Sequence, residues 1–388
     1  MSKKSPDSPP APALPRRERL RRSAARAALV LASIGLSLGI GEIVARLAFK
    51  PARSLSWYHY DLRYGYRHRE NADAQTTEWG DGREWRFRTN SRGFRGVDWP
   101  DTPPAGTQRA LVMGDSFTFG NAVDEEGTYP RVAEATLGAG KGWEVRNAGV
   151  SAWGPQNALA FLETEGAPLG ASCLVYGFFE GNDVVDGLVH HFYELDGDAA
   201  RPIPISGPPP SRLATVRDAM RKVPLYDFLL EHSQLFNIVR SAGLNTLAKH
   251  DQTAPVQDLY TTASKPVFEE ALKLNDATLD RMLALARARF GAFALVLIPE
   301  RGQVAPDTDP LAVPFPLWMA QDSHTRVVAW AKAHDVPVLD MAEAMPKTSE
   351  GVAPYYFKRD FHLSPEGNQL LGRVLGERLP ALCARQAR

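Results

Sequence analysis

The feature that most constrains the fold is an alternation of short apolar runs and amphipathic segments, which begins at Arg109. The runs have the length and composition of buried parallel strands, and they cover residues 110–113, 144–147, 173–178, 293–298 and 336–339. Helical periodicity is found at residues 130–137, 155–165, 268–289, 323–333 and 365–382. Strands that alternate with helices predict a parallel sheet covered on both faces. We therefore expect an α/β domain of three layers, α/β/α, over residues 109–388.

The first predicted strand runs directly into Gly114, Asp115 and Ser116. This places a serine at the carboxyl end of a strand, the edge at which open α/β sheets bind ligands. Gly114 permits a sharp turn, and a helical turn after it would point free N–H groups at whatever binds Ser116. An ordinary turn and helix cap uses the same residue types. The three residues therefore acquire a functional meaning only together with stretches further along the chain.

Three later stretches fall at predicted strand ends or in the last loop, at residues 147–154, 180–183 and 360–367. Acyl transfer by a serine requires a base, a partner that orients the base, and N–H donors for the oxyanion. His362 can be the base and Asp360 its partner, because residues two apart in an extended segment point the same way. Asn182 can donate from its amide. Backbone N–H groups near Ser116 and in the loop after Asn147 complete the predicted oxyanion hole.

In these motifs and their order, the chain resembles the SGNH or GDSL-like hydrolase superfamily, and especially its membrane-anchored bacterial branch. The resemblance covers roughly residues 85–382 and is carried by GDSFTFG, the loop after Asn147, EGND and DFHLSPEG. It implies a flavodoxin-like α/β/α fold and serine esterase or acyltransferase activity. It further implies that Ser116 is the nucleophile, that His362 and Asp360 complete the catalytic triad, and that Asn182 is the oxyanion asparagine.

The sequence departs from the family pattern at two positions. The oxyanion glycine of the family falls at Ala152, where the backbone N–H is kept and a methyl group is added. The aspartate precedes the histidine by two residues instead of the usual three, which resembles the variant in polysaccharide O-acetyltransferases of the alginate type. This spacing slightly favours acyl transfer on glycans.

The N-terminal region predicts a single membrane anchor. Residues 1–26 form a basic tail that we expect to be disordered, with eight Lys or Arg against Asp7 and Glu18. Residues 27–48 are almost entirely apolar, close to the ~20 residues that cross a bilayer. A cleaved signal peptide is the alternative, but no clear cleavage site follows. By the positive-inside rule the tail stays in the cytoplasm, which predicts a single-pass inner-membrane protein with a periplasmic or extracellular catalytic domain.

Two further regions flank the predicted strands. Residues 50–108 are rich in aromatic and basic residues, and Trp85 and Phe87 alternate with arginines as in a strand with one exposed face. We interpret this region as a β-rich lead-in that packs on the catalytic body, with a carbohydrate-binding surface as the alternative. Residues from about 184 to 265 form an insertion with helical spacing, which can serve as a lid or substrate wall.

Composition excludes several other classes of protein. The positive charge is concentrated in the tail, whereas a nucleic-acid binder more often carries it on the folded body. Cys173 and Cys383 predict no disulfide framework. The pair His190 and His191 lacks the spacing of a metal site, so we expect neither metal nor cofactor.

These observations lead to one hypothesis and one alternative. The hypothesis is a membrane-anchored serine esterase or O-acyltransferase that acts on O-acyl, especially O-acetyl, esters of a glycan or lipid. Such an enzyme can work beside the machinery that assembles envelope polysaccharides. The alternative is a non-catalytic assembly protein that binds polysaccharide through the same fold. A binding module has no need of Ser116, His362 and Asp360 together, which favours the enzyme.

Overall fold

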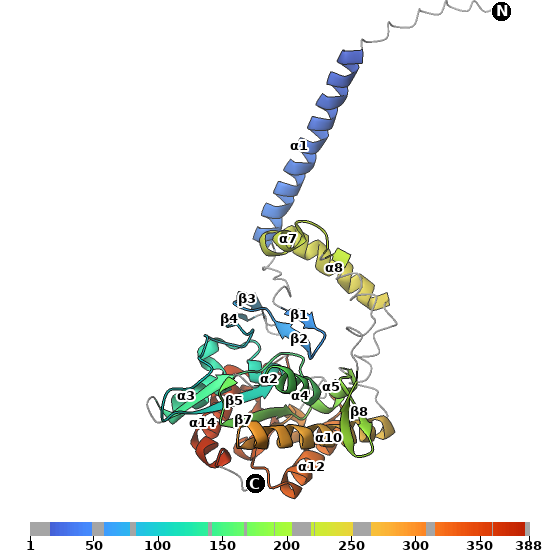
Figure 1. Cartoon of the computed structure of the whole chain (residues 1–388). Coiled ribbons are helices and arrows are strands. Elements are labelled where there is room, and N and C mark those ends of the chain that lie inside the picture. The colour runs from blue at the N-terminus through green and yellow to red at the C-terminus, as the bar shows by residue number, and fades with distance from the viewer. Residues whose placement is uncertain are drawn as a thin grey trace, which may run out of the picture.

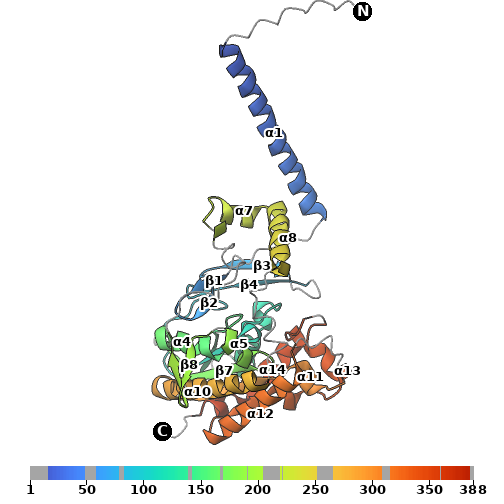
Figure 2. The same ribbon diagram turned by 90° about the vertical axis from the view of Figure 1, so that its right-hand side faces the viewer.

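The computed structural model of this protein describes residues 16–48, 58–77, 83–138, 142–166, 169–189, 191–203, 219–220, 222–250, 265–307, 315–358 and 360–384. A long helix, α1 (Arg16–Ala48), projects from a body that is built around one sheet (Figure 1). The helices α7 (Tyr226–His232) and α8 (Gln234–His250) lie between the end of α1 and this body in both side views (Figures 1 and 2).

The central sheet has five parallel strands in the order β11-β10-β7-β5-β6. Their bounds are β5 (Gln108–Gly114), β6 (Trp143–Asn147), β7 (Cys173–Phe179), β10 (Phe293–Ile298) and β11 (Val338–Asp340). Each of the five overlaps one of the predicted apolar runs, although β11 begins two residues later than the run at 336–339. In chain order the arrangement reads 2-1-3-4-5, which is the flavodoxin-like order. The predicted parallel α/β fold is therefore confirmed.

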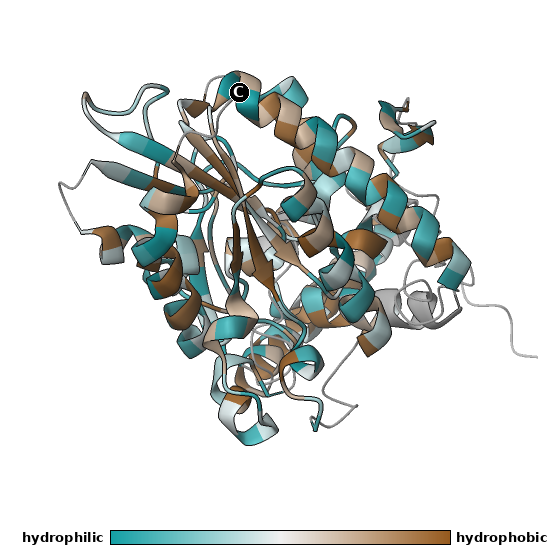
Figure 3. Ribbon diagram, turned by 90° about the horizontal axis from the view of Figure 1, so that it is seen from below, coloured by the Kyte–Doolittle hydropathy of each residue, from teal (hydrophilic) through white to brown (hydrophobic). Residues whose placement is uncertain are grey.

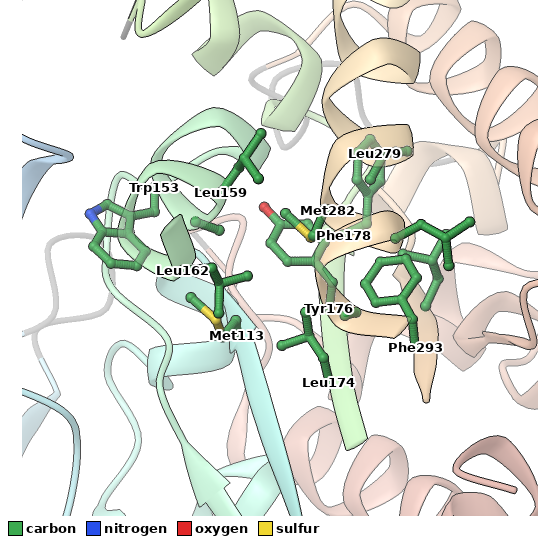
Figure 4. Close-up of a cluster of buried hydrophobic side chains, with 14 of the residues drawn as sticks. Met113, Trp153, Leu159, Leu162, Leu174, Tyr176, Phe178, Leu279, Met282 and Phe293 are labelled. Atoms are coloured by element: carbon green, nitrogen blue, oxygen red, sulfur yellow. The ribbon is translucent and has the colours of Figure 1, made fainter. Parts of the chain in front are cut away.

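Helices cover both faces of the sheet. One face packs against α4 (Pro155–Thr164), α10 (Lys265–Arg289) and α12 (Leu317–Ala333), and the other against α3 (Tyr129–Leu137) and α14 (Pro365–Leu382). Side chains that alternate along a strand enter opposite layers: Leu111 and Met113 join the first core, Ala110 and Val112 the second. Figure 3 shows the apolar strands enclosed by helices of mixed hydropathy, and Figure 4 shows the first core around Met113 and Tyr176.

Shorter elements complete the body. These are the helices α2 (Ser116–Phe119), α5 (Asp183–Val189), α11 (Arg301–Val304) and α13 (Ser349–Val352), with 3₁₀ turns η2 (Glu125–Gly127), η5 (Met341–Ala344) and η6 (Ala353–Tyr355). The lead-in forms two antiparallel hairpins, β1 (Tyr58–Asp61) with β2 (Gly65–His68), and β3 (Asp73–Thr77) with β4 (Glu84–Arg88). In β4, Trp85 and Phe87 are buried and the arginines are exposed. The β-rich interpretation of the described part of this region, including its packing on the body, agrees with this arrangement.

The N-terminal helix begins earlier than expected. Residues 16–26 were expected to belong to a disordered tail, whereas α1 begins at Arg16. The residues share the helix with the apolar segment, so they extend an existing helix and avoid the cost of nucleation, and Arg22 pairs with Glu18 one turn away at 2.7 Å. The stretch Leu20–Ala48 is long and apolar enough to cross a membrane. The first 15 residues lie outside the described part of the chain.

The insertion is only partly helical, in contrast to the expectation for residues 184–265. After α5 it forms a hairpin, β8 (Tyr193–Asp196) with β9 (Ala199–Pro202), which turns at Gly197 and packs on α10. Burial of Tyr193 and Ala200 explains why a strand pair forms here. The predicted helical part is present as α7 and α8, and α8 contacts the end of α1. Residues 204–218, 221 and 251–264 lie outside the described residues.

The two cysteines form a disulfide, contrary to the sequence-based expectation. Cys173 at the start of β7 and Cys383 just after α14 lie 210 residues apart, with their Cα atoms separated by 5.6 Å. Both are buried in the second core. The bond therefore ties the C-terminal end of α14 to the amino edge of the sheet. Sequence spacing could not indicate this pairing because the fold alone brings the two residues together.

We predict that the disulfide contributes substantially to stability. The double variant Cys173→Ser with Cys383→Ser should lower the free energy of unfolding by about 2–5 kcal/mol, since a cross-link over a long loop restricts the unfolded chain. Denaturant unfolding monitored by circular dichroism measures the change. Wild-type protein treated with reductant is the matched comparison and should show the same loss. Unchanged unfolding midpoints in both samples would contradict the prediction.

Candidate active site

Ser116 lies at the point where the strand order of the sheet reverses. It is the first residue of α2 and follows β5, whose two neighbours are β6 and β7. Ligand crevices of open α/β sheets form at this switch point, because the loops of the two flanking strands leave in opposite directions. Gly114 is required here, since a Cβ atom at that position would lie 2.3 Å from the Thr118 hydroxyl oxygen and 2.5 Å from the Gly177 carbonyl oxygen.

A chain of hydrogen bonds joins the three predicted catalytic residues. The Oγ of Ser116 lies 2.7 Å from Nε2 of His362, and Nδ1 of His362 lies 2.5 Å from Oδ1 of Asp360. An ionised carboxylate can only accept, so Nδ1 carries the proton and Nε2 of the neutral ring accepts from the serine hydroxyl. The Asp360 oxygen also accepts from the backbone N–H of His362, at 2.9 Å. This second bond fixes the carboxylate against the same residue that it orients.

The short helix that carries Ser116 is held at both ends. Asp115 caps its beginning by accepting from the N–H of Phe117 at 2.8 Å. At its end, the buried Arg95 donates to the carbonyl oxygens of residues 119, 120 and 123 at 2.6 to 3.0 Å. Asn147 donates to the carbonyl oxygen of Thr118 at 2.8 Å. Sequence analysis did not identify Arg95, because nothing local to it indicates that its partners lie 24 to 28 residues away.

The loop that carries His362 is held by the start of α14. Ser364 accepts from the N–H of Gly367, so it is the predicted N-cap of this helix. The side chain of Asn368 donates to the carbonyl oxygens of Leu363 and Ser364 and accepts from the N–H of Tyr129 on α3. One amide therefore connects the histidine loop to the helix layer beneath it.

The predicted oxyanion donors Ala152 and Asn182 lie in the loops that follow β6 and β7, the two neighbours of β5. No hydrogen bond joins Ala152 or Asn182 to Ser116 in the described residues, and the N–H of Ala152 has no partner there. Ala152 has a φ of +68°, in the region that favours glycine. Asn182 follows β7, and its buried Oδ1 lacks a hydrogen-bond partner within the described part of the chain.

An aromatic wall borders the histidine and was not anticipated. Phe117 and Phe179 stack with ring centroids 3.9 Å apart, and Phe361 meets the Phe315 ring edge-on at 5.2 Å. The rings of Phe117 and Phe361 lie 5.0 and 4.4 Å from that of His362. One side of the site is therefore apolar. The four residues come from different segments, so no spacing in the sequence could have indicated the wall.

Buried carboxyl groups lie behind the serine. Burial raises the pKa of Asp115 to about 6, and burial together with the neighbouring Asp115 carboxyl raises the pKa of Asp183 well above its usual range. Asp183 accepts from the N–H of Phe179 at 3.1 Å and from the Tyr176 hydroxyl at 3.3 Å. These contacts hold the turn between β7 and α5, in which Asn182 lies.

A second polar cluster, around Glu180, supports the turn between β7 and α5. Glu180 is buried and accepts from Gln303 at 2.7 Å, and its other oxygen lies 2.7 Å from Nδ1 of His324. Burial raises the pKa of Glu180, and hydrogen bonding to Glu180 raises that of His324. Glu300 caps α11, and burial raises its pKa to about 7. Glu180 and Glu300 thus fix the loops after β7 and β10.

A family model matches residues 112–370, which is more than half of the chain, and its description is GDSL-like Lipase/Acylhydrolase family. The chain belongs to this family. The match begins within β5 and ends in α14, so it contains the whole hydrogen-bonded chain from Ser116 to Asp360. A search of curated proteins found no match.

Several solved structures are similar to this acylhydrolase-family chain. A carbohydrate acetylesterase from Sinorhizobium meliloti is 14% identical to it, and an aryl esterase from M. smegmatis is 15% identical. Each of these two alignments covers 71% of this chain and 100% of the other protein, with a TM-score of 0.37. A GDSL-like lipase from Bacteroides thetaiotaomicron is 14% identical, with coverages of 72% and 91% and a TM-score of 0.39.

We predict that Arg95 is essential to the stability of the serine turn. Arg95→Met should lower the free energy of unfolding by about 3 kcal/mol or more, because hydrogen bonds from a charged group to several buried carbonyl oxygens are lost. Denaturant unfolding measures the change. Arg88→Met is the matched control, since its side chain is exposed and its ion pair with Glu125 spans 3.7 Å, and it should change stability by less than about 0.5 kcal/mol. Equal effects of the two variants would contradict the prediction.

Proposed function

We propose that this chain is a membrane-anchored serine esterase or O-acyltransferase that acts outside the cytoplasm on O-acyl, especially O-acetyl, esters of a glycan or lipid. The single observation that carries the proposal is the continuous hydrogen-bond chain from Ser116 through His362 to Asp360. A serine hydroxyl is a weak nucleophile on its own, and this arrangement supplies the base and the group that orients it. Family membership supports the same chemistry.

The reaction proceeds through an acyl-serine. Oγ of Ser116 attacks the acyl carbon while Nε2 of His362 takes its proton, and Asp360 stabilises the resulting imidazolium. His362 then gives the proton to the leaving alkoxide as the carbon–oxygen bond breaks. In the second half, water or a sugar hydroxyl attacks the acyl-serine and His362 takes the proton of the attacking group. His362 then returns this proton to Oγ of Ser116 as the bond between Oγ and the acyl carbon breaks. Water releases the free acid, whereas a sugar hydroxyl receives the acyl group as a new ester.

The oxyanion is assigned to three N–H donors. These are the backbone N–H groups of Ser116 and Ala152 and the side-chain amide of Asn182. Both backbone groups are without partners in the described residues, and unpaired donors at a strand end are suited to a charge that develops only in the transition state. The methyl group of Ala152 leaves less room for the acyl group to approach Ser116. A small acyl group, such as acetyl, fits this restriction and can rest against the aromatic wall.

The location of the catalytic domain rests on two observations. Arginines precede the apolar part of α1, which favours a cytoplasmic N-terminus. The Cys173–Cys383 disulfide favours an oxidising compartment for the rest of the chain. Both support a single-pass inner-membrane protein with its domain in the periplasm or outside the cell. Envelope polysaccharide is the acceptor or substrate that such a position makes available.

We predict that ester turnover and covalent labelling depend on Ser116. Ser116→Ala should abolish hydrolysis of 4-nitrophenyl acetate and labelling by a fluorophosphonate, and His362→Ala should be nearly as severe. Asp360→Asn should lower kcat by about 10⁴-fold through the wrong imidazole tautomer, and Asn182→Ala by about 10² to 10³-fold. The double variant of Ser116 and His362 should be little worse than Ser116→Ala alone.

The controls separate an enzyme from a binding protein. Ser172 directly precedes β7, at the end of the strand opposite to the site. Ser172→Ala should therefore keep both ester hydrolysis and fluorophosphonate labelling. Assays with and without an acceptor sugar, analysed by mass spectrometry, separate hydrolysis from transfer. Wild-type protein that binds glycan but neither labels nor turns over any ester would replace the proposal with the non-catalytic assembly protein.

We also predict that the C-terminus lies outside the cytoplasm. An alkaline phosphatase reporter fused after Arg388 should be active, because that enzyme needs an oxidising compartment to form its disulfides. The same fusion with a reporter that is active only in the cytoplasm should be inactive. The reverse pattern would refute the proposed topology.

A further inference from the structure

The end of α1 is joined to the insertion by a charged side chain. The carboxylate of Glu42 accepts from the backbone N–H groups of Gln234 and Leu235, at 2.9 and 3.0 Å, and from the Ser233 hydroxyl at 2.8 Å. These are the donors that a helix leaves unpaired at its N-terminus, and a negative charge there is favourable. Glu42 therefore caps α8 from a different helix, 191 to 193 residues earlier in the chain.

Further contacts fix the angle between the two helices. Arg46 donates to Glu42 at 2.7 Å and to the carbonyl oxygen of His232 at 2.6 Å, so it bridges α1 and the end of α7. Ala45 is buried. A Cβ atom at Gly41 would lie 3.0 Å from a Leu235 methyl group, so α1 and α8 pack closely there. The junction is specific and is built from both polar and apolar contacts.

The junction also locates the membrane surface along α1. Residues 27–41 carry no charge, and a helix of this length spans roughly 22 Å. Arginines before this stretch can extend towards the headgroups at one end. An ionised Glu42 or Arg46 is costly inside hydrocarbon, so both lie at the opposite interface. The start of α8 and the whole of α7 then lie at the same level.

Three apolar side chains on α7 and in the turn before it are exposed. Leu225 and Phe228 are 70% and 55% exposed, and Val223 is similarly exposed. The opposite side of α7 is fixed to α8, because the Tyr226 hydroxyl accepts from Arg240 at 2.8 Å and its ring meets that of Phe236. Both side views place α7 and α8 between the end of α1 and the body (Figures 1 and 2). We call Val223, Leu225 and Phe228 the α7 face.

We propose that the α7 face inserts into the interfacial layer of the bilayer that α1 spans. A lipid surface is the occupant because the face is continuous with the membrane-spanning helix through the Glu42 junction. A helix with an apolar side of aromatic and aliphatic residues is stable in this layer. This inference rests on the membrane anchor of the proposed function and not on the catalytic activity.

Fluorescence quenching in vesicles tests the proposal. The full chain is reconstituted into vesicles of phosphatidylethanolamine and phosphatidylglycerol, and single variants Phe228→Cys and Val223→Cys carry an environment-sensitive fluorophore, since both native cysteines are in the disulfide. Lipids spin-labelled near the headgroup should quench these labels at least about twofold more than a label at Val97→Cys, an apolar position on the body that is 63% exposed. Aqueous iodide should show the opposite order.

Two outcomes overturn the proposal. If the labels at Phe228→Cys and Val97→Cys respond equally to both quenchers, the α7 face is not in the bilayer. A protein partner that covers this face instead would give that result. A label at Leu36→Cys that deep lipid quenchers do not reach would show that α1 does not cross the bilayer. Ester turnover by the same samples is measured separately, so failure of the membrane contact is distinguishable from failure of the enzyme.

Discussion

The hydrogen bond between Ser116 and His362 joins residues 246 positions apart, and the rest of the body serves to keep those two side chains at 2.7 Å. Each end is held independently. The serine turn is held by Arg95, Asn147 and its own aspartate cap, and the histidine loop by the first turn of α14. A contact of this kind costs a large loop-closure entropy, which is offset by burial of the sheet between its two helix layers. The disulfide fixes the other end of α14 and so limits how far the histidine loop can move.

The site also concentrates features that reduce stability. Ala152 adopts a left-handed backbone conformation, Asp115 and Asp183 are buried carboxyl groups near one another, and Asn182 has a buried oxygen without a partner in the described residues. Each such feature typically lowers the free energy of unfolding by about 1–3 kcal/mol. Proteins keep such features where a function needs them. Their clustering at the switch point of the sheet supports the location of the site independently of the hydrogen-bonded chain.

The apolar helix α1 and the helical part of the insertion are joined directly. Glu42 on α1 caps α8, and Arg46 on α1 donates to the last residue of α7. These contacts bring together segments that lie almost 200 residues apart in the sequence.

The strands, the covering helices and the apolar N-terminal helix were predictable from the sequence, because local periodicity involves residues close together in the chain. Short motifs indicated Ser116, His362, Asp360 and Asn182 as the candidate site, and the resemblance to the family added Ala152. The Cys173–Cys383 pairing, the hydrogen bonds from Arg95, the aromatic wall and the cap that Glu42 provides for α8 became visible only in the folded chain. Each of these joins segments that are distant in sequence, and no local pattern records which distant partner a side chain will meet once the chain has closed on itself.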